Sequence, residues 1–164
     1  MKIKYLGTAA YEGVPALFCN CEVCKKSRAA GGRNLRTRSQ ALVDDKIMID
    51  FNPDTVTHTM TYGIDWEKIE GVIITHAHSD HLYPSDAEIA TGCYSHDHRK
   101  INFYSGKAGY DMLKPYTIDC DAEKTSLTLV EPLKKFTVGG YEILPLPADH
   151  GQDTSPVIYS IAKD

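Results

Sequence analysis

Long hydrophobic runs are absent from this sequence of 164 residues. Apolar stretches such as residues 71–75 are far shorter than the roughly 18 residues that a membrane-spanning helix needs. The first ten residues, MKIKYLGTAA, also lack the apolar segment of a secretory signal peptide. We therefore expect a cytoplasmic protein without a membrane partner.

A strong excess of positive charge is also lacking. The chain carries 18 basic and 22 acidic side chains, which gives a formal net charge of −4. No overall basic field is available to attract nucleic acid, so we do not expect nucleic acid as a partner. An anionic substrate would need local help, such as a metal ion.

Internal repeats, low-complexity tracts and Pro/Ser-rich linkers are missing as well. The composition, 42% hydrophobic and 24% charged, fits one globular domain over residues 1–164. Strand and helix patterns alternate in the first part of the chain, and short strand patterns dominate from residue 127 onward. This order predicts an α/β fold in which mixed sheets are covered by helices. Strands are expected at residues 2–6, 39–43, 46–51, 71–75, 101–104, 127–130, 136–138, 141–144 and 157–161, and helices at 22–30, 52–60, 84–91 and 107–114.

Four residues of metal-binding type follow the apolar run 71–75, in the segment T-H-A-H-S-D-H-L. They lie within six positions, on the loop after a predicted buried strand, where open α/β sheets usually build their sites. Imidazole nitrogens bind Zn²⁺ or Mn²⁺ well. In an extended loop, His76 and His78 can close on one ion while Asp80 and His81 face a second. Two ions about 3.5 to 4 Å apart could clamp both oxygens of a displaced ester.

The five cysteines are unevenly spaced, and three of them lie within six positions. Cys19, Cys21 and Cys24 are close enough for one tetrahedral Zn²⁺ and leave a position for a distant fourth ligand. This pattern fits metal ligation in a reducing compartment better than a disulfide framework, and three thiolates favour a structural site. The alternative is three free thiols in a loop, as we expect for the isolated Cys93 and Cys120.

The segment T-H-A-H-S-D-H-L closely resembles the H-x-H-x-D-H signature of the metallo-β-lactamase superfamily. The resemblance implies a four-layer αβ/βα sandwich with a metal centre at the sheet edge. It implies that His76 and His78 bind one metal and that Asp80 and His81 bind the other. It also implies a later histidine that completes the first metal, and His150 in the segment P-A-D-H-G matches that position.

The loop from Gly7-Thr8 to C-N-C-x-x-C, followed by R-x-R-S and a hairpin, resembles one branch of this superfamily. That branch is typified by the phosphoribosyl cyclic phosphodiesterase of the carbon–phosphorus lyase pathway. The resemblance implies that Cys19, Cys21 and Cys24 hold one structural zinc together with a histidine near the C-terminus of those proteins.

Family members continue well beyond the predicted strand 157–161. There they supply a bridging aspartate, a final histidine for the second metal and the histidine that completes the cysteine site. Asp164 comes too early for the bridging role. We therefore expect the N-terminal portion of the fold, incomplete at the C-terminus, with an unfinished sheet edge that favours a homodimer.

Two further polar segments have weaker signals. The S-H-D-H cluster at residues 95–98 and the lone His58 are interpreted as ordinary polar positions rather than ligands. The stretch 25–38 has no acidic residue and forms either a solvated face or a surface that steers a phosphate toward the site. Its basic residues are Lys25, Lys26, Arg28, Arg33, Arg36 and Arg38.

These patterns favour hydrolysis of a small phosphodiester, cyclic ones included, by a metal-bound hydroxide at a centre of two Zn²⁺ or Mn²⁺ ions. Asp80 would orient or deprotonate the nucleophile as well as bind the second metal. Two alternatives stay open. One is a hydrolase of the same fold that acts on RNA, a thioester or a lactone. The other is a zinc-binding structural module or an inactive truncated relative.

Overall fold

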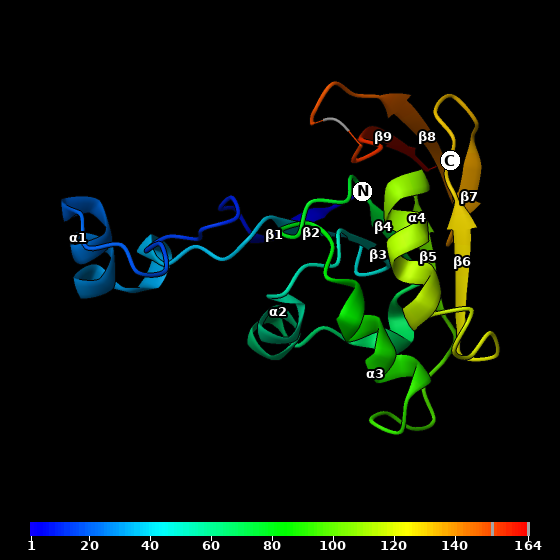
Figure 1. Cartoon of the computed structure of the whole chain (residues 1–164), viewed down its shortest axis with the longest axis horizontal. Helices are drawn as coiled ribbons and strands as arrows, with labels where there is room; N and C mark the ends of the chain where they lie inside the picture. The colour runs from blue at the N-terminus through cyan, green and yellow to red at the C-terminus, as the bar shows by residue number, and fades with distance from the viewer. Residues whose placement is uncertain (152, 164) are drawn as a thin grey trace.

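The computed structural model describes residues 1–151 and 153–163. These residues form two β-sheets and a set of helices on the outer face of the larger sheet (Figure 1). One helical segment stands apart from this body. The main body positions the candidate histidines, and the separate segment carries the cysteine cluster.

The larger sheet has six strands in the order of the chain. The first three strands pair antiparallel, and the third to sixth pair parallel. The carboxyl ends of the four parallel strands therefore meet at one end of the sheet. The strands are β1 (Ile3–Gly7), β2 (Gln40–Val43), β3 (Ile47–Ile49), β4 (Gly71–Ile74), β5 (Ile101–Ser105) and β6 (Thr125–Leu129).

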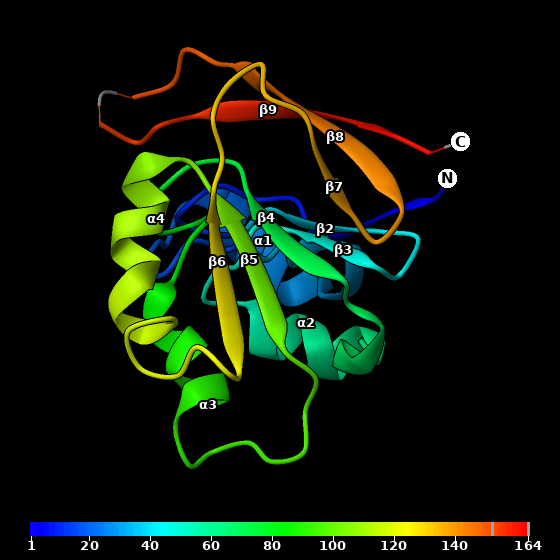
Figure 2. The same ribbon diagram turned by 90° about the vertical axis from the view of Figure 1, so that its right-hand side faces the viewer.

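The smaller sheet is antiparallel and consists of β7 (Phe136–Val138), β8 (Tyr141–Pro147) and β9 (Val157–Ala162). It packs across one face of the larger sheet, as Figure 2 shows. Buried Tyr141 and Ile143 meet Ile47 and Ile73 there. The other face of β4 is covered as well, so all four of its residues are buried. This explains why the strand is a continuous hydrophobic run.

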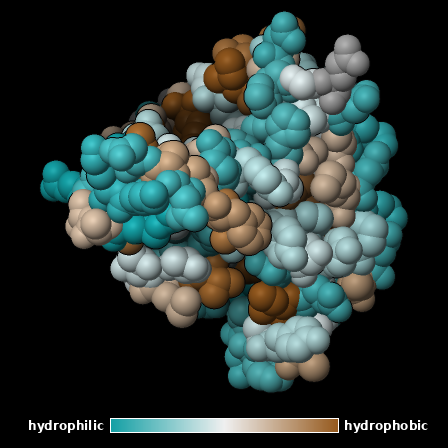
Figure 3. Space-filling model, turned by 60° about the vertical axis from the view of Figure 1, so that its left-hand side comes forward, coloured by the Kyte–Doolittle hydropathy of each residue, from teal (hydrophilic) through white to brown (hydrophobic). Residues whose placement is uncertain are grey.

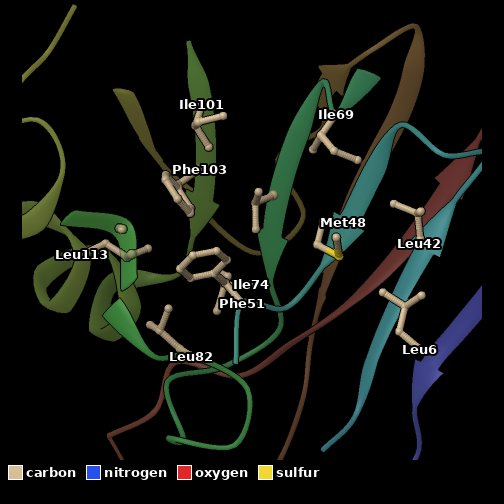
Figure 4. Close-up of a cluster of buried hydrophobic side chains, with 12 residues drawn as sticks. Leu6, Leu42, Met48, Phe51, Ile69, Ile74, Leu82, Ile101, Phe103 and Leu113 are labelled. Carbon is tan, nitrogen blue, oxygen red and sulfur yellow. The ribbon is translucent and has the colours of Figure 1, made fainter. Parts of the chain in front are cut away.

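The second face of the larger sheet is covered by α2 (Thr55–Tyr62), α3 (Glu88–Thr91) and α4 (Lys107–Leu113). Single 3₁₀ turns η2 (Trp66–Lys68), η3 (Pro84–Ala87) and η4 (Lys114–Tyr116) complete this layer. Figure 4 shows Phe51 and Phe103 in the resulting core, between the sheet and the helical side, with ring centroids 5.4 Å apart. The described chain thus builds three layers: helices, six-stranded sheet and three-stranded sheet.

Residues 10–36, here called the α1 lobe, project from the body, as Figure 1 shows. The lobe contains α1 (Glu22–Ala30) and the 3₁₀ turn η1 (Gly32–Asn34). The helix ends at Gly31, whose φ of 60° favours glycine. At its base, the N–H groups of Thr8 and Ala9 both donate to the carbonyl of Thr37. The helix that the sequence predicts at residues 22–30 is confirmed.

The other predicted elements are also found, with shifts of a few residues at their ends. The predicted helix 84–91 is divided into η3 and α3, and the predicted strand 127–130 begins already at Thr125. Asp164 lies outside the described residues. Among the helices that the structure describes, none is long and apolar enough to cross a membrane.

Candidate metal centre

The candidate centre begins where β3 and β4 end side by side. Asp50 directly follows β3, and its N–H donates to the carbonyl of Ile73 at 2.9 Å. The Asp50 Oδ1 accepts hydrogen bonds from the N–H and the hydroxyl of Thr75, both at 2.8 Å. One buried carboxylate therefore joins the carboxyl ends of two neighbouring parallel strands. It fixes the first residue of the histidine loop.

His76, His78 and His150 come together in the centre. Each offers one ring nitrogen, and these nitrogens lie within 4.8 Å of one another. The Nε2 of His76 is 3.1 Å from the Nδ1 of His78, and the ring centroids of His76 and His150 are 4.7 Å apart. The ligand atoms of a tetrahedral zinc ion lie about 3.4 Å apart, so this set of three imidazoles fits one metal ion.

The loop between β8 and β9 brings His150 to the other two histidines. Thr154 secures this loop: its carbonyl accepts from the N–H of Ala77 at 3.2 Å, and its hydroxyl donates to the carbonyl of His150 at 2.8 Å. Gly151 has a φ of 67°, and a Cβ there would lie 3.1 Å from His78 Cε1. The glycine after His150 thus permits the close approach of the two loops.

Asp80 and His81 lie beside these three histidines. The Nδ1 of His81 is 2.7 Å from Asp50 Oδ2, and its Nε2 is 3.5 Å from Asp80 Oδ2. The rings of His76 and His81 have centroids 4.1 Å apart. With Nδ1 used by Asp50, the Nε2 of His81 faces Asp80 and is available to a second ion. No third ligand joins this pair among the residues that the structure describes.

The electrostatic environment keeps the first histidine neutral. Burial lowers the pKa of His76 to about 4, and the neighbouring imidazoles of His81, His150 and His78 act in the same direction. Burial also opposes the charged form of His81, but the hydrogen bond and charge of Asp50 raise its pKa. At neutral pH, His76 therefore has the free lone pair that metal binding requires.

The three cysteines predicted as ligands also come together, in the α1 lobe. The Sγ atoms of Cys19, Cys21 and Cys24 lie within 4.8 Å of one another. Cys24 is buried in α1 and accepts from the N–H of Ala16 at 3.4 Å. The N–H of Cys24 and the two neighbouring thiols lower the pKa of Cys21 to about 7. These properties suit a thiolate site for zinc, although the ligand roles stay a prediction.

The isolated cysteines, the histidines of residues 95–98 and the basic stretch 25–38 lie in ordinary environments. Cys93 and Cys120 are exposed free thiols. His96 is exposed, whereas His98 is half-buried with its ring nitrogens 3.0 Å from the carbonyl of Ala90 and 2.8 Å from that of Arg99. In the basic stretch, Arg38 pairs with Asp54 at 3.1 Å and Lys26 with Glu22 at 3.1 Å.

Asp50 is the functional residue that sequence reasoning missed. A usable signal existed, because Asp50 follows an apolar strand just as His76 does, and parallel strands place such positions at the same end of a sheet. The signal is weak in the sequence because Asp50 lies 25 residues before Thr75, the residue that it holds at the start of the histidine loop.

No protein-family model matches the sequence. Among solved structures, the crystal structure of a diphosphatase from the PhnP family matches with a TM-score of 0.75 and 23% identity, over 97% of this chain and 61% of that chain. The metallo-β-lactamase fold protein YhfI from Bacillus subtilis matches with a TM-score of 0.60 and 18% identity, over 98% of this chain and 57% of that chain. The chain has the metallo-β-lactamase fold. This confirms the predicted fold class, of which the described residues form three layers.

One curated relative is an octanoyltransferase of Porphyromonas gingivalis (strain ATCC BAA-308 / W83). It is 28% identical over 166 residues, which cover 93% of this chain and 31% of that protein. The metallo-β-lactamase-fold chain described here therefore spans about a third of the length of this relative.

Proposed function

We propose that this chain belongs to a metal-dependent hydrolase and that its substrate is a small phosphodiester. The observation that carries the proposal is the convergence of His76, His78 and His150, whose ligand nitrogens lie within 4.8 Å. A structural neighbour with the same fold is a diphosphatase, which supports a substrate that is attacked at phosphorus. The thiol cluster in the α1 lobe supports the phosphodiesterase branch that the sequence resembles.

The position of each candidate ligand suggests its role in the proposed reaction. The three histidines would hold one ion, and Asp80 with His81 would hold part of a second site. A divalent ion in such a centre lowers the pKa of a water molecule and offsets the negative charge of phosphoryl oxygens. Asp80 Oδ2, which faces His81 Nε2, would orient the attacking water and take up its proton.

Neighbouring residues fix the orientation of His81 and the protonation state of His76. Asp50 holds the Nδ1–H of His81 and thereby directs Nε2 toward Asp80. Burial of His76 maintains the neutral imidazole. His150 is exposed, which leaves the centre open to a substrate from solution.

The test combines metal content with turnover. We expect elemental analysis to find Zn²⁺ or Mn²⁺ at the histidines and one further Zn²⁺ at the thiols, and we expect bis-p-nitrophenyl phosphate to be hydrolysed. His78→Ala and Asp80→Ala should each lower kcat by at least about 100-fold. His96→Ala is the matched control, because His96 is exposed in a separate loop. Unchanged turnover in His78→Ala would rule out the proposed centre.

A second candidate is a zinc-binding structural module without catalytic activity. The observation in its favour is that only Asp80 and His81 approach the second metal position within the described residues. This candidate requires one zinc per chain at Cys19, Cys21 and Cys24, and no turnover of any ester. A panel with a cyclic phosphodiester, an RNA, a thioester and a lactone would separate it from hydrolases with other substrates.

A further inference from the structure

A cavity of about 320 Å³ lies on the helical side of the larger sheet, and none of the candidate metal ligands lines it. Phe51, Trp66 and Phe103 contribute aromatic rings to its wall. Val56 and Met60 from α2 also line it and are 48% and 73% exposed, so the cavity has an opening at this helix. Figure 3 shows one face of the molecule, with patches of hydrophobic residues (brown) among hydrophilic ones (teal).

The cavity opens to solvent at α2, so its size is compared with that of ligand-binding cavities rather than with closed interior voids. An apolar cavity of roughly 150 Å³ already binds a benzene ring, and natural ligand pockets begin at about 300 Å³. The space beside Phe51 therefore suits a molecule with about six to ten carbon atoms.

Most polar groups in the wall are already used by the protein. The hydroxyl of Thr59 accepts from Trp66 Nε1 at 3.1 Å, and that of Thr55 donates to the carbonyl of Asn52 at 2.6 Å. Ser95 Oγ donates to the carbonyl of Ile89 at 2.8 Å. The ring nitrogens of His98 both face carbonyl oxygens.

Asp86 is different. It lines the cavity and is half-buried, and within residues 1–151 and 153–163 no hydrogen bond or ion pair involves its carboxyl group. Because none of the buried side-chain oxygens there lacks a partner, the carboxyl oxygens of Asp86 are in contact with solvent at the cavity. Burial raises the pKa of this carboxyl group. An acceptor in an otherwise apolar wall favours a ligand that brings a hydrogen-bond donor and disfavours one that brings a negative charge.

We propose that this cavity is a binding site for a small amphiphile with an apolar body of about six to ten carbon atoms and an uncharged hydroxyl head that donates to Asp86. The body would lie against Phe51, Trp66 and Phe103. The site is distinct from the candidate metal centre, and its occupation does not depend on the proposed hydrolysis.

Trp66 makes the proposal directly measurable, because it is the single tryptophan of the chain and part of the cavity wall. We expect saturable changes in its fluorescence when 1-hexanol or 1-octanol is added to the metal-loaded protein. Each buried methylene should tighten binding about fourfold, so 1-octanol should bind about 16-fold more tightly than 1-hexanol. Octanoate should bind more weakly than 1-octanol, and Asp86→Asn should reduce that difference.

A variant that fills the space provides the decisive control. Ala90→Phe places a ring inside the cavity and should abolish binding, whereas Ala122→Phe, at an exposed position outside it, should not. Changes in the amide chemical shifts of the wild-type protein when 1-octanol is added give a second measurement. This measurement does not depend on the folding of a variant. Shifts confined to the cavity wall support the site. Absence of saturable binding, equal binding by Ala90→Phe, or shifts centred on the α1 lobe would overturn it.

Discussion

Asp50 is the side chain on which the geometry of the candidate centre depends most. Its two oxygens are divided between Thr75 and His81, so that one carboxylate positions the start and the end of the histidine segment. The group is only 4% exposed, which shields both interactions from water. A residue with this placement can control metal binding without touching the metal.

Asp50→Asn tests that role with an almost identical shape. The amide has no negative charge, and one of its two ends cannot accept a hydrogen bond. We expect the affinity for Zn²⁺ at the histidines to fall about 10- to 100-fold. Competition with a fluorescent chelator measures this affinity. Asp65→Asn, at an exposed position in front of η2, is the control and should bind Zn²⁺ normally.

The histidine cluster could be predicted from sequence because its members are adjacent in the chain. His150 required the resemblance to a family, since a single histidine 69 residues or more away carries no local signal. Asp50 and the wall of the apolar cavity were not predicted, because their roles depend on which strand ends lie side by side. Residue type reveals a candidate ligand, but only the fold reveals its support.

The α2 helix is joined to the larger sheet by a buried polar chain. His58 lies on α2 with Nδ1 2.5 Å from Gln40 Oε1 and Nε2 2.7 Å from Thr37 Oγ1. Gln40 Nε2 in turn donates to the carbonyl of Asp50 at 3.0 Å. This chain extends from the base of the α1 lobe to the strand end that carries Asp50, with the buried His58 ring at its centre.

His58 should make the stability of the fold sensitive to acid. Burial lowers its pKa, against the opposing charge of Asp54. Below about pH 6.5, the unfolded chain therefore binds a proton at His58 that the folded chain does not bind, and stability falls as the pH decreases toward the folded pKa. Compared with His58→Gln, the wild type should lose up to about 1.4 kcal/mol more per pH unit in this range.

Urea unfolding at a series of pH values between 7 and 5, in the presence of a chelator, measures this difference. His76 titrates in the same direction, but it is present in both proteins and cancels in the comparison. Parallel stability curves for the wild type and His58→Gln would show that His58 does not take part.

The two sheets lie close together at Gly71, the first residue of β4. A Cβ at this position would lie 2.6 Å from Val138 Cγ1 and 2.9 Å from Tyr104 Cε2. The contact explains why an apolar strand begins with glycine. It also predicts that the space between the sheets cannot accept one more methyl group without a shift of its neighbours.

Gly71→Ala should therefore lower the free energy of unfolding by about 1 to 3 kcal/mol. Chemical denaturation measures this value. Val138→Ala removes the atom closest to the new methyl group, so the double variant should be more stable than the sum of the two single effects predicts. Strict additivity would show that Val138 is not the source of the strain.

In the molecule as a whole, the body and the α1 lobe are each stabilised in a different way. The body has two hydrophobic clusters, one on each face of the larger sheet. The α1 lobe has little core of its own, with Cys24 and Ser27 as the buried residues of its helix. We infer that a zinc ion at the three thiols would take the place of a core there.

Removal of metal should thus loosen the α1 lobe before the body. With a chelator present, we expect trypsin to cut first within the lobe, at sites such as Lys25 and Arg33, and the body to stay intact for longer. Mass spectrometry of the early fragments identifies the sites. Cys21→Ser should be cut in this way even without the chelator, and Cys93→Ser should behave like the wild type. Early cleavage in the body instead would contradict the role assigned to the thiols.

The order of strands and layers follows from sequence to a considerable extent. The apolar run at residues 71–75 indicated a buried strand, which is β4, and the strands predicted at residues 136–138 and 141–144 are found as the neighbouring strands β7 and β8. The projection of the α1 lobe was not predicted. Its helix pattern is an ordinary one, and nothing in residues 22–30 indicates whether a helix lies on the sheet or stands away from it.

The α1 lobe also gives the molecule an uneven outline, with a compact body and an extension on one side (Figure 1). Friction in water depends on this outline and not only on the mass of 18.2 kDa. The protein should sediment more slowly than a sphere of equal mass. Its rotation should be anisotropic, so that nuclear spin relaxation differs between N–H bonds along the long axis and those across it.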